Sequence, residues 1–205
     1  ELLRLCLQSL KGTSHNLSYE ILVLDSESQE ETQEMLNNEW PEIKFFLFKK
    51  NTGYAKIVNV GLMEAKGDYL LVLNADIIVE KDSLKEMIEY LSVNKKVGMI
   101  GSQLLNFNGT IQESCFRFYR LLTVVYRRTF LGNISWGKKE LDRFEMKDFD
   151  RKSTREVDWL LGAAMMIKRQ ALSEVGLMDE RFFFFFFFAD WGSRFSKLGR
   201  SVVYI

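Results

Sequence analysis

The sequence predicts an α/β fold with a mostly parallel central sheet and helices on both faces. Along the first half, short and continuously apolar runs, typical of strands buried on both faces, alternate with helical patterns. Repeated strand–helix units favour parallel pairing, because each helix returns the chain to the same end of the sheet. The composition agrees with a compact fold, since 47% of the 205 residues are hydrophobic and Pro41 is the only proline.

The first half supplies helices and strands in strict alternation. Two helix ends are recognisable: Gly67 is a C-terminal stop, and Asp82 or Ser83 lies near the start of the next helix. In chain order, the predicted elements are a helix over 1–10, a strand over 20–25, a helix through about Asn37, a strand over 44–49, a helix over 54–66, a strand over 68–76, a helix over 81–93 and a strand over 97–101.

The second half is less regular. Residues 117–155 mix charges with aromatic side chains and predict loops with one or two short helices. Seven consecutive Phe over 182–188 fit either a buried strand and loop or, if exposed, a segment prone to aggregation. The other predicted elements are a hairpin turn at Asn108-Gly109 between 103–107 and 111–116, a strand or strand pair over 156–168, and short helices over 170–175 and 190–198.

The composition also excludes several classes of function. With 28 Lys and Arg against 28 Asp and Glu, the chain has no basic excess for a broad nucleic-acid surface. His15 is the only histidine, which excludes a multi-histidine metal site and a Ser–His–acid triad. Cys6 and Cys115 are too few for a disulfide framework and fit a reducing, cytoplasmic compartment.

The two ends of the sequence limit what can be predicted from it. No signal peptide is visible, and no apolar run reaches the ~20 residues of a membrane helix. The chain starts on a helix without Met and closes on the apolar run 201–205, so we expect it to be truncated at both ends.

Polar side chains end two of the predicted strands. Asp25 ends one, and Asn74 and Asp76 end another, at the edge where open parallel sheets bind ligands. Asn74 and Asp76 lie on one side of an extended segment and supply the oxygen ligands that a hard divalent cation prefers. Either Asp25 or Asp76 alone favours a helix cap, whereas the two together favour a site.

A turn at Asn51-Thr-Gly-Tyr-Ala55 follows a strand and leads into a helix. The Gly lets the backbone approach a ligand closely, and the N-terminus of a helix attracts phosphate. By itself, however, an Asn-x-Gly sequence more often forms an ordinary turn that binds no ligand. The sequence lacks both G-x-G-x-x-G and a Walker loop, which weakens dinucleotide and P-loop interpretations.

These segments form an ordered series. The chain resembles the inverting family 2 glycosyltransferases over nearly its whole length, and most of all the rhamnosyltransferase-type enzymes that build bacterial surface polysaccharides. The resemblance is carried by Ile21-Leu-Val-Leu-Asp25, Asn51-Thr-Gly-Tyr-Ala55, Asn59-Val-Gly61, Gly67-Asp-Tyr-Leu-Leu-Val-Leu-Asn-Ala-Asp76, Val157-Asp-Trp-Leu-Leu-Gly-Ala163 and Val175-Gly-Leu-Met-Asp-Glu-Arg-Phe182.

The resemblance implies a GT-A fold in a single domain over 1–205, with a nucleotide-sugar-binding half over 1–102 and an acceptor-binding half over 103–205. It implies a nucleotide-diphosphate sugar as donor, a sugar or lipid-linked acceptor, and Mg²⁺ or Mn²⁺ as cofactor, with Asp76 as the metal ligand. The donor-side residues that it implies are Asp25 at the nucleotide base, Glu27, Gly53, Tyr54, Asn59 and Asn74, and those of the acceptor side are Asp158, Trp159, Gly162 and Ala163.

The chain departs from the family pattern at the position of the catalytic acids. Where the family carries a Glu-Asp pair, this chain has Phe187 and Phe188, and of that cluster only Asp190 remains. Phe cannot accept a proton, so three alternatives remain: Asp190 is the general base, activity is impaired, or the Phe run departs from the natural sequence. A non-catalytic sugar-nucleotide-binding module is therefore the alternative function, and a nucleotidyltransferase on a related sheet is a third.

Residues 116–131 interleave Arg with aromatic and aliphatic side chains. A basic amphipathic stretch of this kind suits a peripheral membrane contact, where a lipid-linked acceptor would lie. An ordinary surface helix, with Arg paired to acids, is the alternative.

Overall fold

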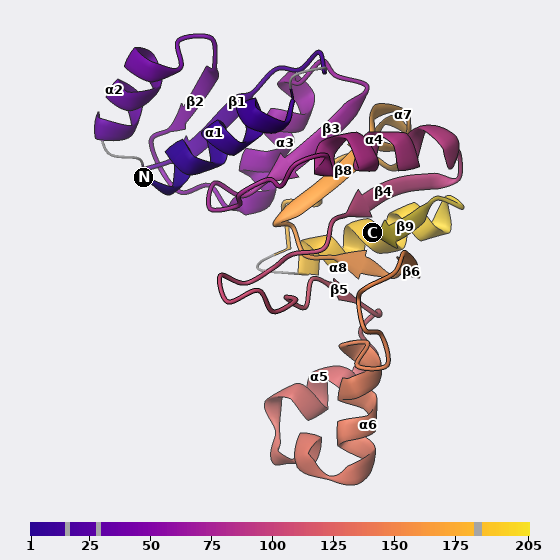
Figure 1. The fold of residues 1–205 in the computed structure, drawn as a ribbon. Helices are drawn as coiled ribbons and strands as arrows, with labels where there is room; N and C mark the ends of the chain where they lie inside the picture. The colour runs from indigo at the N-terminus through magenta and orange to yellow at the C-terminus, as the bar shows by residue number, and fades with distance from the viewer. Residues whose placement is uncertain (15–16, 28–29, 183–185) are drawn as a thin grey trace.

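The computed structural model describes residues 1–14, 17–27, 30–182 and 186–205 (Figure 1). The expected alternation of helices and strands in the first half is confirmed, with ends that differ from prediction by a few residues. The elements are α1 Leu2–Thr13, β1 Leu22–Ser26, α2 Glu30–Glu39, β2 Lys44–Phe48, α3 Tyr54–Glu64, β3 Tyr69–Leu73, α4 Ser83–Val93, β4 Val97–Gly101, β5 Cys115–Phe116, α5 Leu121–Arg128, the 3₁₀ helix η1 Phe130–Asn133, α6 Ser135–Phe144, β6 Arg155–Val157, β7 Trp159–Leu160, β8 Ala164–Lys168, α7 Arg169–Val175, α8 Phe186–Lys197 and β9 Ser201–Tyr204.

The central sheet is mixed, so the expectation of a mostly parallel sheet is wrong. Its strand order in the described chain is β3-β8-β4-β9-β6, and only β4 and β9 are parallel neighbours. Strand β8 from the second half lies between β3 and β4 and runs against both of them. Strands β1 and β2 form a separate parallel pair. A helix between two strands does not make them neighbours when a later strand inserts between them.

The second half differs from the predicted pattern in three places. The turn at Asn108-Gly109 is confirmed, but one bridge between Leu105 and Ile111 replaces the expected hairpin strands. The predicted strand over 156–168 is divided into β6, β7 and β8, whose partners are β9, β5, and β3 with β4. Helix α8 begins at Phe186, so the end of the Phe run is helical rather than strand and loop, and 183–185 lie outside the described residues.

Both halves of the chain contribute to one hydrophobic core. Leu70 and Met99 of the first half pack in the same cluster as Trp191 and Tyr204 of the second, and all four are at most 4% exposed. The shared sheet and core support our proposal that residues 1–205 form a single domain.

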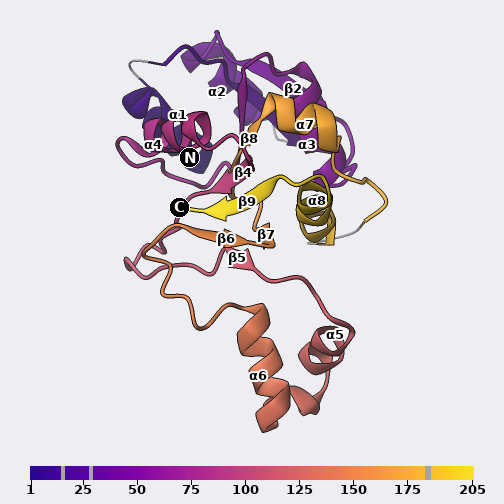
Figure 2. The ribbon, with the colours of Figure 1, turned by 90° about the vertical axis from the view of Figure 1, so that its right-hand side faces the viewer.

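Helices α5 and α6, joined by η1, form a helical hairpin (residues 120–144) that projects from the α/β body beyond β5 and β6 (Figures 1 and 2). Its base is held by Phe144, which is 1% exposed and stacks on Phe116. None of the helices in the described ranges combines the length and apolar character required to span a membrane.

Candidate functional site

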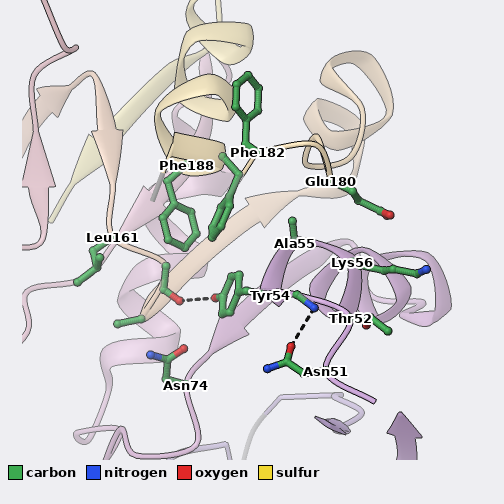
Figure 3. Close-up of a pocket in the computed structure, with 14 residues that line it drawn as sticks. Asn51, Thr52, Tyr54, Ala55, Lys56, Asn74, Leu161, Glu180, Phe182 and Phe188 are labelled. Carbon is green, nitrogen blue, oxygen red and sulfur yellow. Dashed lines mark hydrogen bonds between the residues drawn. The ribbon is translucent and has the colours of Figure 1, made fainter. Parts of the chain in front are cut away.

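The turn before α3 positions the first wall of a pocket. Gly53 has φ of 90°, a conformation that side chains disfavour, and its N–H donates to Asn51 Oδ1 over 3.0 Å (Figure 3). The turn directs the N-terminus of α3, residues 54–56, into the pocket lining. The first N–H groups of a helix lack intrahelical partners and favour an anion, so this wall suits a phosphate.

The pocket has a volume of about 680 Å³ and draws its walls from four separated segments. Helix α3 meets the end of β3, the turn before β8 and the start of α8 (Figure 3). Its lining residues are 51–56, Asn74, 161–163, Glu180, Phe182, Phe187 and Phe188.

Three aromatic rings form one side of this pocket. Tyr54 stacks on Phe187 with ring centroids 5.4 Å apart and meets Phe188 edge-on at 5.5 Å. The Tyr54 hydroxyl donates to the carbonyl oxygen of Gly162 over 2.8 Å, and burial raises the pKa of Tyr54, so the donor keeps its proton. A Cβ on Gly162 would lie 2.0 Å from Phe188, so only glycine fits this approach.

Removing the Tyr54 hydroxyl tests this wall. We expect Tyr54→Phe to lower the free energy of unfolding by about 1 kcal/mol, because the ring still stacks but a buried carbonyl loses its donor. Urea denaturation measures the change. Tyr119→Phe, which removes a contact to Arg127 at the surface, is the matched control and is expected to change stability by less than about 0.5 kcal/mol. Equal effects of the two variants would contradict the assignment.

A second cavity, of about 600 Å³, adjoins the first. It lies between β1 and β3, and Tyr54 and Asn74 line both cavities. Asp25, near the end of β1, lines the second cavity, whereas Glu27 lies outside both and is exposed with φ of 62°. The structure thus brings Asp25 together with Tyr54 and Asn74, and leaves Glu27 apart.

Asp76 offers a free carboxylate beside the pocket. It is exposed, and no other described residue forms an ion pair or hydrogen bond with it. Burial of the Cys6 thiol raises its pKa to about 11, and the nearby negative charge of Asp76 contributes to the same shift. Asp76 does not cap the following helix, whose N-cap is Asp82, and Asp25 lies within β1, so the capping interpretation is wrong for both.

The described residues can supply only some of the ligands of a hard divalent cation. The described chain contains no cluster of three or more His, Cys, Asp or Glu that could enclose a metal ion. Asn74 and Asp76 can offer oxygen ligands, and such a cation commonly takes its other ligands from water and substrate phosphates. The donor set therefore suits Mg²⁺ or Mn²⁺ bound together with a diphosphate.

Asn59 lies beneath the pocket rather than in it. It is 2% exposed, its amide donates to Met178 O over 2.9 Å and to Glu180 Oε1 over 3.0 Å, and its Oδ1 accepts from Met178 N. These bonds fix the segment 178–180 against α3. The structure therefore gives Asn59 a positioning role for that segment, with no direct place in the lining.

Of the predicted acceptor-side residues, Gly162 and Ala163 line the pocket. The Asp158 carboxylate accepts from Phe118 N over 2.6 Å and from Arg117 over 3.2 Å. Trp159 is 3% exposed and donates its indole N–H to Arg117 O. These two side chains hold the entry to the helical hairpin and lie outside the lining.

Asp190, the predicted general base, is engaged elsewhere. Its carboxylate accepts from Arg194 Nε over 2.9 Å, and Arg194 also donates to Val175 O. Asp190 is not part of the lining, in which Phe187 and Phe188 represent α8. The helix therefore presents apolar rings to the pocket and its acid to an arginine.

Two charged lining residues were missed from the sequence. Lys56 is the one cation in this lining and follows the Asn51–Ala55 turn directly, which is the signal that could have indicated it. Glu180 is the one carboxylate there, but its Oε1 accepts from Asn59 and its side chain is directed away from Tyr54 and Phe188 (Figure 3).

Several glycosyltransferases of known structure are similar to this chain in fold. The mannosyltransferase PcManGT from Pyrobaculum calidifontis, solved with GDP-Man and Mn²⁺, aligns with a TM-score of 0.62 at 15% identity, over 98% of this chain and 50% of that one. Staphylococcus aureus TarS aligns with a TM-score of 0.63 at 13% identity, over 100% of this chain and 54% of that one. The fold is therefore the GT-A glycosyltransferase fold.

Comparison of the sequence with protein families identifies the family of this chain. Residues 1–176 match Glycosyl transferase family 2, and the chain belongs to this family. An N-acetylglucosaminyl-diphospho-decaprenol L-rhamnosyltransferase of Mycobacterium tuberculosis is 24% identical over 90% of this chain, which spans 63% of that relative's length. A poly-beta-1,6-N-acetyl-D-glucosamine synthase of Staphylococcus epidermidis is 29% identical over 84% of this chain and 38% of its own length.

Proposed function

We propose that this chain transfers a sugar from a nucleotide-diphosphate donor to a hydroxyl acceptor, with inversion at the anomeric carbon, in the synthesis of a bacterial surface polysaccharide. One observation supports this most strongly. The pocket joins the N-terminus of α3, Asn74 after the end of β3, and Gly162 in a chain of glycosyltransferase family 2.

The two cavities divide the donor between them. The diphosphate would lie against the N–H groups of residues 54–56, and the nucleotide base would extend toward Asp25. Asp76 would hold the metal with Asn74, and a bound Mg²⁺ or Mn²⁺ neutralises charge on a leaving diphosphate. The mannosyltransferase and GalNAc-T7 structures that share the fold contain Mn²⁺, which supports this assignment.

The acceptor would enter past Gly162 from the half of the chain over 103–205. The mycobacterial relative is named for a diphospho-decaprenol acceptor, which supports a sugar or lipid-linked acceptor here. A cytoplasmic location is supported by Cys6 and Cys115, which are both free and buried. No nucleic-acid partner is proposed, because the chain has no net positive charge.

Deprotonation of the acceptor hydroxyl is the slow step of the proposed reaction. Asp190 is the acid that would deprotonate the acceptor hydroxyl, which then attacks the anomeric carbon while the nucleoside diphosphate leaves. Because Asp190 is paired with Arg194 and lies outside the lining, its assistance is small and transfer is slow.

A second candidate is a sugar-nucleotide-binding module without transfer activity. The observation that favours it is the aromatic wall, in which Phe187 and Phe188 are each 6% exposed and pack on Tyr54. This candidate predicts donor binding without any product.

Asp190→Asn separates these candidates. We expect transfer to fall by roughly tenfold to 100-fold, with donor affinity unchanged, because Asn accepts no proton. Product formation and calorimetric donor binding are measured side by side. Asp179→Asn, an acid in the same segment that pairs with Arg181, is the matched control. Full transfer by Asp190→Asn would refute its role, and donor binding without turnover in the unmodified chain would establish the second candidate.

A further inference from the structure

The helical hairpin 120–144 exposes large apolar side chains on all three of its helices. Leu121 of α5 is 83% exposed, Phe130 of η1 is 78% exposed, and Trp136 of α6 is 62% exposed. On α5, Leu122 and Val125 are also exposed, whereas Thr123 and Tyr126 are buried. The hairpin therefore has an inner side that packs and an outer side with exposed apolar side chains, of which Trp136 also meets Tyr126 edge-on with ring centroids 5.8 Å apart.

Cations share the outer side of the hairpin. Arg128 follows Leu121 and Val125 at seven and three residues, on the same side of α5, and Lys139 follows Trp136 at three residues on α6. Residues 120–144 hold six Lys or Arg and two Asp or Glu, in a chain whose total charge is zero. Within the described part of the chain, Arg128, Lys138 and Lys139 form no ion pair. The hairpin thus carries a net positive charge beside its exposed apolar side chains.

Hydrogen bonds and close packing hold the helices of the hairpin together. Glu140 of α6 accepts from Thr123 of α5 over 2.5 Å and from Arg143, and the Arg143 guanidinium holds the pKa of Glu140 at about 2, so it stays ionised. At the tip, a Cβ on Gly137 would lie 2.0 Å from Leu131 O, so α6 and η1 approach too closely for any side chain. The exposed side chains are therefore held on a fixed frame.

We propose that the helical hairpin 120–144 docks this protein on an anionic lipid surface. Apolar side chains enter the boundary between headgroups and acyl chains, and the neighbouring Arg and Lys meet lipid phosphates. The contact begins later than the predicted 116–131 segment, because Phe116, Phe118 and Tyr119 pack on the core. It also extends further along the chain, because Trp136 of α6 is exposed. Docking at this end does not involve the pocket residues.

Vesicle binding by the chain over 1–205 tests this proposal. Vesicles of equal parts phosphatidylcholine and phosphatidylglycerol are expected to sediment the protein, and vesicles of phosphatidylcholine alone are not. Trp136 is the reporter, since the other three tryptophans are at most 7% exposed, and its emission is expected to shift to the blue on binding. Equal binding to both vesicles, or binding to neither, would overturn the proposal.

Variants locate the contact. Phe130→Ser is expected to weaken binding by about tenfold or more, and the pair Arg128→Gln and Lys139→Gln by about 25-fold. Phe107→Ser removes a side chain that is 97% exposed elsewhere and is expected to have no effect. Unfolding curves confirm that the variants fold. An equal loss with Phe107→Ser, or a dimer in free solution that Phe130→Ser abolishes, would assign this face to something other than lipid.

Discussion

Replacing Phe187 with Glu and Phe188 with Asp is expected to raise the rate of sugar transfer by roughly 10²–10⁴-fold, the usual contribution of a positioned general base. Both rings line the pocket, so carboxylates at these positions would face the site where the acceptor hydroxyl must lose its proton. Single-turnover measurement of product, with donor and metal in excess, reports the chemical step directly.

The matched control is Phe187→Gln with Phe188→Asn, which keeps size and polarity but supplies no proton acceptor. Both pairs remove the stacking with Tyr54, so both are expected to lose stability to a similar degree. An equal gain from acids and amides would mean that the aromatic wall obstructs the pocket. No gain from either, in a folded protein that binds donor, would show that the missing acids are not what slows transfer.

Asp76→Ala is expected to weaken metal-dependent donor binding by about 100-fold or more, because a carboxylate that ligates the metal is lost. Asp76 has no other partner among the described residues, so its removal is not expected to disturb the fold. Calorimetry with donor and Mn²⁺ measures the affinity of both proteins.

Glu80→Ala is the control, since Glu80 is an exposed acid in the same connection between β3 and α4. If Asp76→Ala bound donor as tightly as the unmodified chain and kept its response to metal, the metal assignment would be abandoned. If Glu80→Ala were equally impaired, the loss would reflect the general negative charge of this connection.

Local patterns predicted most of the first half, because each buried strand there is a continuous apolar run. They could not predict that β8 inserts between β3 and β4, since strand order depends on contacts between residues far apart in the sequence. The start of α8 was placed too late because seven identical rings carry no period, so a helix and a strand look alike over 182–188.

Local sequence patterns also predicted part of the site. Gly53, Asn74 and Gly162 lie at turns that end or begin regular elements, and the structure brings all three to one pocket. Asn59 and Asp158 are polar residues in matching segments, but their hydrogen bonds go to backbone and side-chain atoms of the protein itself, to Met178 and Glu180 and to Phe118 and Arg117. A motif indicates that a polar side chain is needed, whereas only the fold shows whether it faces a ligand or a carbonyl.

Hydrogen–deuterium exchange with a panel of UDP-, GDP- and dTDP-sugars and Mn²⁺ tests the central proposal most directly. We predict that at least one donor protects residues 51–56, 74–76 and 161–163, that a chelator removes this protection, and that the helical hairpin 120–144 is unaffected. Protection elsewhere, or none with any donor that calorimetry shows to bind, would contradict the assignment of this pocket to the sugar nucleotide.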